Sequence, residues 1–196
     1  MTGQDMDRAT ITVAMQNEQV AEKIKYALQR DGYYVGDICT SGNEAIRKVR
    51  SGPPDILLIG FEMPDVTGLE VATIVGDENL CSVILFITSV QRDFCVSIVE
   101  DYDITLFLKP INRVALLSTI DTVLQNRRRI GRMEKELCEL KQGMEDRKAI
   151  ERAKGILMKR KSISEGEAYR RIQKMSMDSR VAMRDISLKI IELSQN

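Results

Sequence analysis

Residues 147–191 read RKAIERAKGILMKRKSISEGEAYRRIQKMSMDSRVAMRDISLKII and predict three short amphipathic helices that carry many Lys and Arg side chains. In the first helix, apolar residues recur at helical spacing and predict one buried face: Ala149, Ile150, Ala153, Ile156 and Leu157. Ser164, followed three residues later by Glu167, is the signature of a capping box, in which hydroxyl and carboxylate oxygens accept hydrogen bonds from free N–H groups. The second helix is therefore expected to begin just after Ser164.

The two later helices also divide into an apolar side and a basic side. Their expected inward positions are Ala168, Ile172 and Met175 in the second helix and Ala182, Ile186, Ile190 and Leu193 in the third. Arg170, Arg171 and Lys174 fall on the other side of the second helix, and Arg180 and Arg184 point outward in the third. The sequence thus predicts a small three-helix bundle with a cationic surface.

This stretch resembles the ANTAR domain, the RNA-binding module of bacterial transcription antitermination regulators. The matching segments are ERAKGILM at 151–158, SEGEAY at 164–169 and MDSR at 177–180. The resemblance implies binding to paired small hairpins in an mRNA leader, one hairpin for each ANTAR module of a dimer. Such binding prevents a competing terminator stem from forming, so that the polymerase reads through.

The cationic surface suggests how RNA would be held. Release of condensed counterions drives the binding of phosphates, whereas loop bases are read by hydrogen bonds and by stacking on flat side chains. Lys154, Arg160 and Lys174 are the expected phosphate contacts, and Tyr169 is a stacking candidate whose alternative role is a half-buried core residue. The full set of predicted RNA-binding residues is Arg147, Lys154, Arg160, Tyr169, Arg170, Arg171, Lys174, Arg180 and Arg184.

The charge of the chain is unevenly distributed along its length. The formal net charge of the 196 residues is zero, but residues 1–126 hold 10 Lys and Arg against 18 Asp and Glu, whereas residues 127–196 hold 19 against 11. This asymmetry indicates that only the second part meets a polyanion, the alternative being that charged helix faces are simply solvated. We expect a domain over 9–125, a linker helix over 126–146 and an RNA-binding domain over 147–196.

The first part alternates strand and helix signals. The expected strands are 10–15, 35–39, 55–60, 82–88 and 105–108, and the expected helices are 18–30, 43–50, 69–76 and 94–101. The continuous apolar runs 56–59 and 83–87 are typical of parallel strands that are covered on both faces. The sequence therefore predicts an α/β, doubly wound, five-stranded parallel (flavodoxin-like) domain with strand order 2-1-3-4-5 and a functional edge at the strand carboxyl ends.

The segment PDILLIGFEMP at 54–64, with Gly68 downstream, is similar to the third strand and following loop of response-regulator receiver domains. Thr88, Phe107 and the Lys109-Pro110 pair match the switch hydroxyl, the aromatic residue and the Lys-Pro of that family. The resemblance places the phosphoacceptor aspartate three residues before the Met-Pro, where this chain has Gly60. It also places an acidic, Mg²⁺-holding pair at the end of the first strand, where this chain has Met15 and Gln16.

Without these acidic residues, the chain lacks the groups that a receiver uses to accept a phosphoryl group. Phosphoryl transfer to a receiver needs a carboxylate nucleophile and a divalent cation held by hard oxygen ligands, and Met, Gln and Gly supply no anionic charge. Glu62 and Asp65 belong to the following loop and are not expected to act as acceptors, and Lys109 is expected to cap a polar cavity or to pair with an acid such as Glu62. We therefore predict a pseudo-receiver that serves dimerisation or the binding of a regulatory protein or ligand.

A helical pattern continues after Pro110 and connects the two parts. Ile130, Met133, Leu137, Leu140 and Met144 step by 3, 4, 3 and 4, which is the a/d seam of a coiled coil. No proline follows Pro110, so one helix from about Arg113 to beyond Met144 is expected. We expect two copies of this helix to pair and form a homodimer. The alternative is a helix that folds back on its own domain. The flanking Arg127, Arg128, Arg129 and Arg132 would fringe the coil or add to nucleic-acid affinity.

The remaining composition excludes several classes of function. The four cysteines are scattered and the chain has no histidine, so no zinc site, disulfide framework or hydrolase machinery is expected, and neither are a metal, a cofactor or an enzymatic activity. No signal segment or long apolar run is present, which predicts a cytoplasmic protein without a membrane partner. The alternatives to an RNA-binding antiterminator are a DNA-binding regulator, a protein-interaction scaffold and a phosphorylated switch.

Overall fold

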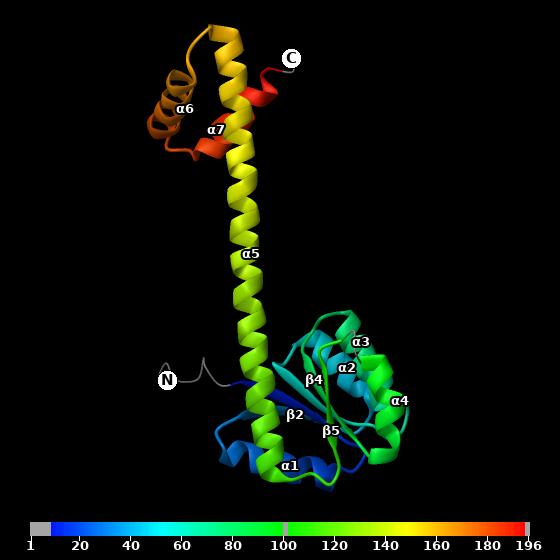
Figure 1. Cartoon of the computed structure of the whole chain (residues 1–196). Coiled ribbons are helices and arrows are strands. Elements are labelled where there is room, and N and C mark those ends of the chain that lie inside the picture. Colours follow the sequence, from blue (N-terminus) through cyan, green and yellow to red (C-terminus); the bar gives the residue numbers. More distant parts are fainter. Residues whose placement is uncertain (1–8, 100–101, 195–196) are drawn as a thin grey trace. The chain divides into compact units, whose positions relative to one another are not determined.

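The computed structural model describes residues 9–99 and 102–194, which divide into two compact units after Arg129. The first unit is built on a five-stranded parallel sheet in the order β2-β1-β3-β4-β5 (Figure 1). Its strands are β1 (Thr10–Ala14), β2 (Tyr34–Cys39), β3 (Ile56–Gly60), β4 (Ser82–Ile87) and β5 (Ile104–Leu108). The predicted fold class and strand order are confirmed.

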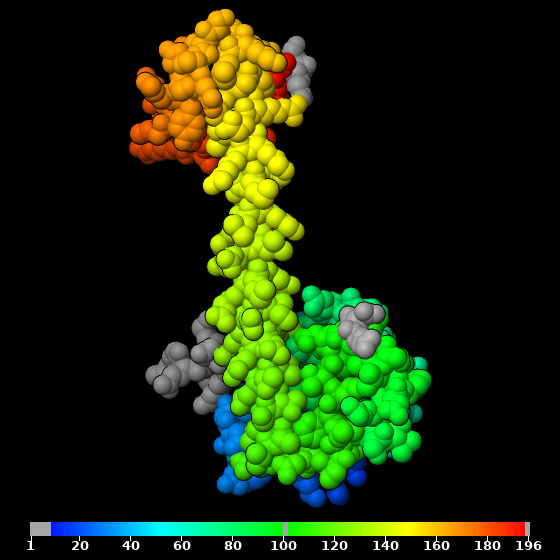
Figure 2. Space-filling view, viewed as in Figure 1, coloured from blue at the N-terminus to red at the C-terminus, as the bar shows by residue number. Residues whose placement is uncertain are grey.

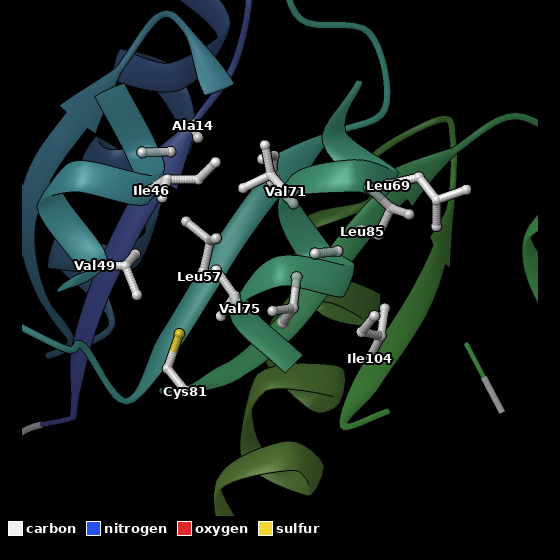
Figure 3. Packing of buried hydrophobic residues seen from close by; sticks show 14 of the residues in the cluster. Ala14, Ile46, Val49, Leu57, Leu69, Val71, Val75, Cys81, Leu85 and Ile104 are labelled. Carbon is white, nitrogen blue, oxygen red and sulfur yellow. The ribbon is translucent and has the colours of Figure 1, made fainter. Parts of the chain in front are cut away.

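Helices cover both faces of this sheet. The intervening helices are α1 (Glu18–Arg30), α2 (Gly42–Ser51), α3 (Gly68–Asp77) and α4 (Ser89–Val99). Residues of α2, α3 and α4 pack on one face of the sheet, as Figure 3 shows for Ile46, Val49, Val71 and Val75, and residues of α1 and α5 pack on the other. Strands β3 and β4 are buried at every position, which is the burial that their continuous apolar runs predict.

Helix α4 differs from its predicted range of 94–101. It begins five residues earlier, at Ser89, where the side-chain oxygen of Gln91 accepts a hydrogen bond of 2.8 Å from the Thr88 backbone N–H. This contact satisfies one backbone donor at the helix start, a function that the sequence pattern around Val90 does not reveal. The last two residues of the predicted range lie outside the described residues.

Helix α5 (Arg113–Lys161) runs through 49 residues and confirms the predicted long helix. The first of the three short helices predicted in the C-terminal stretch is the end of α5, and α6 (Glu165–Ser179) and α7 (Met183–Glu192) follow it. Ser162 and Arg180 adopt left-handed backbone conformations, with φ of 50° and 53°, at the two places where the chain leaves a helix. The predicted capping box of Ser164 and Glu167 is present at the start of α6.

The second unit has its own small core, in which Ala153 of α5, Ile172 of α6 and Ile186 of α7 meet. Three predicted inward positions are wrong, because Met175, Ala182 and Leu193 are exposed. On α6 the inner position after Ile172 is Ser176, whose hydroxyl donates a 2.6 Å hydrogen bond to the Val181 carbonyl. Ala182 and Leu193 are the residues that cap α7 at its two ends, so neither lies on its inner stripe.

Candidate nucleic-acid interface and receiver edge

The carboxyl edge of the sheet, where β1 and β3 end, is where a parallel sheet of this order places a functional site. Met15 follows β1 directly and is buried, whereas Gln16 is exposed. Gly60 ends β3, and a Cβ added there would lie 3.2 Å from the Met15 sulfur. The thioether therefore fills the space beside the position at which the receiver pattern has its aspartate.

Asp65, in the loop after β3, has a defined structural role. Its carboxylate accepts hydrogen bonds of 2.7 Å and 2.9 Å from the backbone N–H groups of Gly42 and Asn43, at the start of α2. The N–H of Asn43 contributes most to holding the pKa of Asp65 well below its usual range, and burial opposes this shift. Asp65 therefore belongs to the cap of α2. Glu62 is exposed in the same loop.

The three receiver-like residues that the sequence retains lie around this edge. Phe107 is buried and packs edge-on against Phe86, with ring centroids 5.3 Å apart, and Thr88 is half-buried just before α4. Lys109 is exposed, and over residues 9–99 and 102–194 it has no ion pair. Of the two roles expected for Lys109, pairing with an acid such as Glu62 is therefore not found in the part of the chain that the structure describes.

Arg127 on α5 was expected to fringe a coiled coil or to contact nucleic acid, and the structure gives it another position. Its side chain is half-buried in the first unit. The guanidinium donates 3.4 Å hydrogen bonds to the hydroxyl of Ser82 and to the carbonyl oxygen of Leu80, beside the start of β4. Arg127 thus ties α5 to the sheet, and no periodic pattern in the sequence predicts this contact.

The second unit presents cations on α6. Arg170, Arg171 and Lys174 are exposed, on the side of the helix away from the buried Ala168 and Ile172. Over the described residues none of these three cations is in an ion pair. Tyr169, beside them on α6, is 43% exposed, so part of its ring faces solvent. Arg147 is exposed on α5. These five side chains are available to a ligand.

Other predicted RNA-binding residues are engaged within the module. Lys154 is only 7% exposed, and its ammonium group lies 2.7 Å from a carboxylate oxygen of Glu151 and 2.7 Å from one of Glu165. Hydrogen bonds to these two carboxylates raise the pKa of Lys154. Arg160 donates 3.2 Å hydrogen bonds to the backbone carbonyls of residues 193 and 194, after α7.

The remaining two arginines lie at the start and end of helices. Arg184 pairs with Asp146 of α5 at 3.2 Å, and Arg180 is the exposed left-handed residue that ends α6. The predicted basic residues therefore fall into two groups. One group faces solvent and comprises Arg147, Arg170, Arg171, Lys174 and Arg180. In the other group Lys154, Arg160 and Arg184 contact other segments of the module.

The predicted coiled-coil seam lies on α5 within the second unit. Ile130, Met133, Leu137, Leu140 and Met144 are between 51% and 62% exposed, and every residue from 130 to 145 is exposed. This segment, yellow-green in Figure 2, presents its side chains to solvent on the visible face. We call these five residues the seam. Among the described residues of this unit, no element covers their apolar side chains.

The thiol and carboxylate groups of the described residues lie apart from one another. Among the described residues no three His, Cys, Asp or Glu side chains are placed to share a metal ion. Cys39, Cys81 and Cys95 are buried, and Cys138 is exposed. Burial is the main cause that raises the pKa of Cys39 and of Cys81 to about 12. No helix of the described chain combines the length and the apolar character that a membrane span requires.

Two known protein families match this chain, one in each part. The model of the response regulator receiver domain matches residues 11–121, and the model of the ANTAR domain matches residues 139–191. Both domains are regulatory rather than catalytic. The transcriptional regulatory protein PdtaR of Mycobacterium tuberculosis (strain ATCC 25618 / H37Rv) is 25% identical over 197 residues, covering 98% of this chain and 96% of that protein.

Solved structures resemble the first unit. The receiver domain of a putative Luxo repressor protein from Vibrio parahaemolyticus has a TM-score of 0.58 at 19% identity, covering 65% of this chain and 98% of that one. The response regulator TrrA from Thermotoga maritima, in complex with Mg²⁺ and BeF, has a TM-score of 0.53 at 26% identity, covering 59% of this chain and 98% of that one. These structures agree in the receiver fold.

Proposed function

The chain belongs to the response regulators in which a receiver domain precedes an ANTAR domain, and we propose that it is an RNA-binding regulator of transcription antitermination. In this proposal the C-terminal module binds hairpins in an mRNA leader and prevents a terminator stem from forming. The protein acts in the cytoplasm, where it meets the transcript, and performs no catalysis. The observation that carries the proposal is the set of exposed cations on α6 that form no ion pair with any described residue, within the residues that match the ANTAR domain.

Two physical features favour RNA as the ligand. Arg170, Arg171 and Lys174 stand on a helix whose opposite side is fixed in the core by Ala168 and Ile172, so the cations project from a rigid base. Phosphate neutralisation by such cations releases counterions and supplies affinity for any polynucleotide. Tyr169 and the arginine planes add flat surfaces on which unpaired loop bases stack.

We also propose that the receiver works without phosphorylation. This part rests on Gly60 at the acceptor position, on the Met15 thioether beside it and on Asp65, whose carboxylate is committed to the cap of α2. A regulatory protein or a ligand would replace the phosphoryl signal. The third part of the proposal is a homodimer through the seam, supported by its five exposed apolar side chains.

The RNA proposal is tested with the full chain and two libraries of equal length, one of RNA stem-loops with randomised loops and one of duplex DNA. We expect selective retention of stem-loops at equal salt. Arg170→Ala with Arg171→Ala should weaken binding at least about tenfold and lower the slope of log affinity against log salt by about 0.7–0.9 for each phosphate that the variant no longer neutralises. The matched control is Arg47→Ala with Arg92→Ala, two exposed arginines of the first unit, which should change neither.

Preference for duplex DNA would favour a DNA-binding regulator instead, and binding of neither library would favour a protein-interaction scaffold. The pseudo-receiver proposal has a separate test, incubation of the chain with acetyl phosphate and Mg²⁺ followed by mass spectrometry. We expect no added phosphoryl group, which has a mass of about 80 daltons. A gain of that mass that disappears in Asp65→Asn or Glu62→Gln would identify a substitute acceptor and contradict the proposal.

A further inference from the structure

The seam of α5 can pair with a second copy in more than one direction, and its sequence distinguishes between them. Taking Ile130 as position a of a heptad, the seam residues occupy positions a, d, a, d and a in order. A parallel pair in register places each seam residue against its own counterpart. All five layers are then apolar against apolar.

An antiparallel pair places a positions against d positions and loses one of these layers. When Ile130 faces Leu140, Met133 faces Leu137, and Met144 is left opposite the polar Asn126. When Leu137 faces Leu140, Met133 faces Met144, and Ile130 is left opposite the charged Arg147. Because two heptads of Leu, Met and Ile are only marginally stable, the loss of one layer in five is decisive.

Charges beside the seam also favour the parallel arrangement. In a parallel pair, position g of one helix lies beside position e of the next heptad of the other helix. Glu136, at g, then faces Lys141, at e, and Arg129, at the preceding g, faces Glu134, at e. Both pairs have opposite charges, and symmetry makes each pair occur twice. All four side chains are exposed, and within the described residues none of them has an ion-pair partner in its own chain.

We propose that two copies of this chain associate as a parallel, in-register coiled coil through the seam, flanked by Glu136–Lys141 and Arg129–Glu134 pairs between the copies. The inference rests on the homodimer of the proposed function and adds its direction and register. A parallel coil places the two C-terminal modules at the same end of the pair. Two neighbouring hairpins of one transcript are then within reach of one dimer, and binding of the first raises the effective concentration for the second.

The direction is tested by disulfide trapping in the full chain, with the exposed Cys138 replaced by Ser and the three buried cysteines left in place. In a parallel pair Met133→Cys meets its own counterpart, so a chain with this substitution alone should form a disulfide-linked dimer in a glutathione buffer. Leu140→Cys should behave in the same way. Gln142→Cys, exposed on the outer side of the same helix, is the matched control and should remain monomeric on a non-reducing gel.

The antiparallel alternatives give a different pattern, in which Met133→Cys chains link to Leu137→Cys or Met144→Cys chains more readily than to themselves. That result would overturn the parallel arrangement. Sedimentation equilibrium of the reduced chain separates this failure from failure of the dimer itself. A dimer with the mixed pattern contradicts only the direction, whereas a monomer at all concentrations contradicts the homodimer as well.

The flanking pairs have their own test. Glu136→Lys and Lys141→Glu should each weaken self-association about tenfold, because each change turns an attractive pair into a repulsive one on both sides of the coil. An equimolar mixture of the two variants should associate as tightly as the unaltered chain. Lys135→Glu reverses the charge of an exposed residue on the outer side of the helix and should have no effect. A mixture that associates no better than either variant alone would contradict the Glu136–Lys141 pairing.

Discussion

Individual charged residues in this protein have the same chemistry but different roles, and burial separates them. Lys154 and Lys174 both lie within the residues that match the ANTAR domain, yet Lys154 is buried between two carboxylates whereas Lys174 is exposed and unpaired among the described residues. To contact Lys154, a phosphate must displace the two carboxylates that already bind it. To contact Lys174, a phosphate must displace only water. Lys154 therefore positions α6 against α5 through Glu165 and is a weaker candidate for contacting RNA.

This distinction predicts the salt dependence of two variants. Lys154→Met keeps the length of the side chain and removes its charge, so it should weaken RNA binding and loosen α6 while leaving the slope of log affinity against log salt unchanged. Arg171→Ala should lower that slope by about 0.7–0.9. The measurement is filter binding of stem-loop RNA over a range of salt concentrations. If both variants lower the slope of log affinity against log salt equally, Lys154 contacts a phosphate after all.

Asp65 predicts a dependence of stability on pH. Hydrogen bonds from backbone N–H groups, that of Asn43 foremost, hold its pKa below the unfolded value near 4. A group whose pKa is lowered by folding stabilises the folded state. This stabilisation is fully present above the pKa of the unfolded state and is lost as the pH falls through the pKa of the folded state. The melting temperature of Asp65→Asn should therefore lie below that of the unaltered chain at about pH 7, and the difference should shrink below about pH 4.

Thermal melts at several pH values provide the measurement. Asp93→Asn, an exposed position on α4, is the matched control and should show no such trend. A difference between Asp65→Asn and the unaltered chain that stays constant down to about pH 3 would show that the cap of α2 does not depend on the charge of Asp65.

At the level of helices, short side-chain caps determine where each element begins. Asn17, Ser41, Thr67 and Ser164 each accept a hydrogen bond from a backbone N–H at the start of α1, α2, α3 and α6. Thr67 and Ser164 add a carboxylate three residues later, which satisfies a second donor. Because α6 carries the exposed cations, its cap fixes the start of the proposed RNA surface.

Loss of that cap should loosen α6 selectively. Ser164→Ala removes the hydroxyl that accepts from the Glu167 N–H and should cost about 1 kcal/mol. Hydrogen exchange of the α6 amides, followed by mass spectrometry, should then accelerate about fivefold, while exchange in β3 and β4 stays unchanged. Ser164→Asp retains an acceptor and should exchange like the unaltered chain. Equal acceleration in both variants would show that the cap contributes no stability to α6.

For the whole protein, the two units differ in how they bury apolar surface. The first unit covers both faces of its sheet with helices, whereas the second has a core of a few residues and leaves the seam of α5 exposed. A row of five exposed apolar side chains is expected to be covered by another molecule, and the proposed second copy provides that cover.

The dimer makes a prediction about RNA that carries two hairpins. Leu137→Glu places a charge in the centre of the seam and should keep the chain monomeric. Affinity for a transcript with two neighbouring stem-loops should fall by about a hundredfold, because the second stem-loop is no longer held at a raised effective concentration. Affinity for a single stem-loop should be unchanged, and Gln142→Glu on the outer side serves as the control. An equal reduction of affinity for both RNAs would show that Leu137 supports the fold of the module and not pairing.

The sequence alone was sufficient for features that depend on near neighbours or on periodicity. The apolar runs of β3 and β4, the Ser164–Glu167 cap and the continuity of α5 all follow from spacing along the chain. The absence of an aspartate at Gly60 is equally visible in the sequence. These properties are local, because hydrophobic period and capping chemistry act over a few residues.

Only the tertiary structure decided which side chains remain available to a ligand. Lys154 contacts Glu165 eleven residues away, Asp65 accepts a hydrogen bond from Gly42 at the start of α2, and Arg127 meets Ser82 across 45 residues. Met175, expected inside, is exposed, and Ser176 takes the inner position, where its hydroxyl donates a hydrogen bond to the Val181 carbonyl in the turn after α6. Contacts between distant residues depend on how elements pack, and spacing along the chain contains no record of that packing.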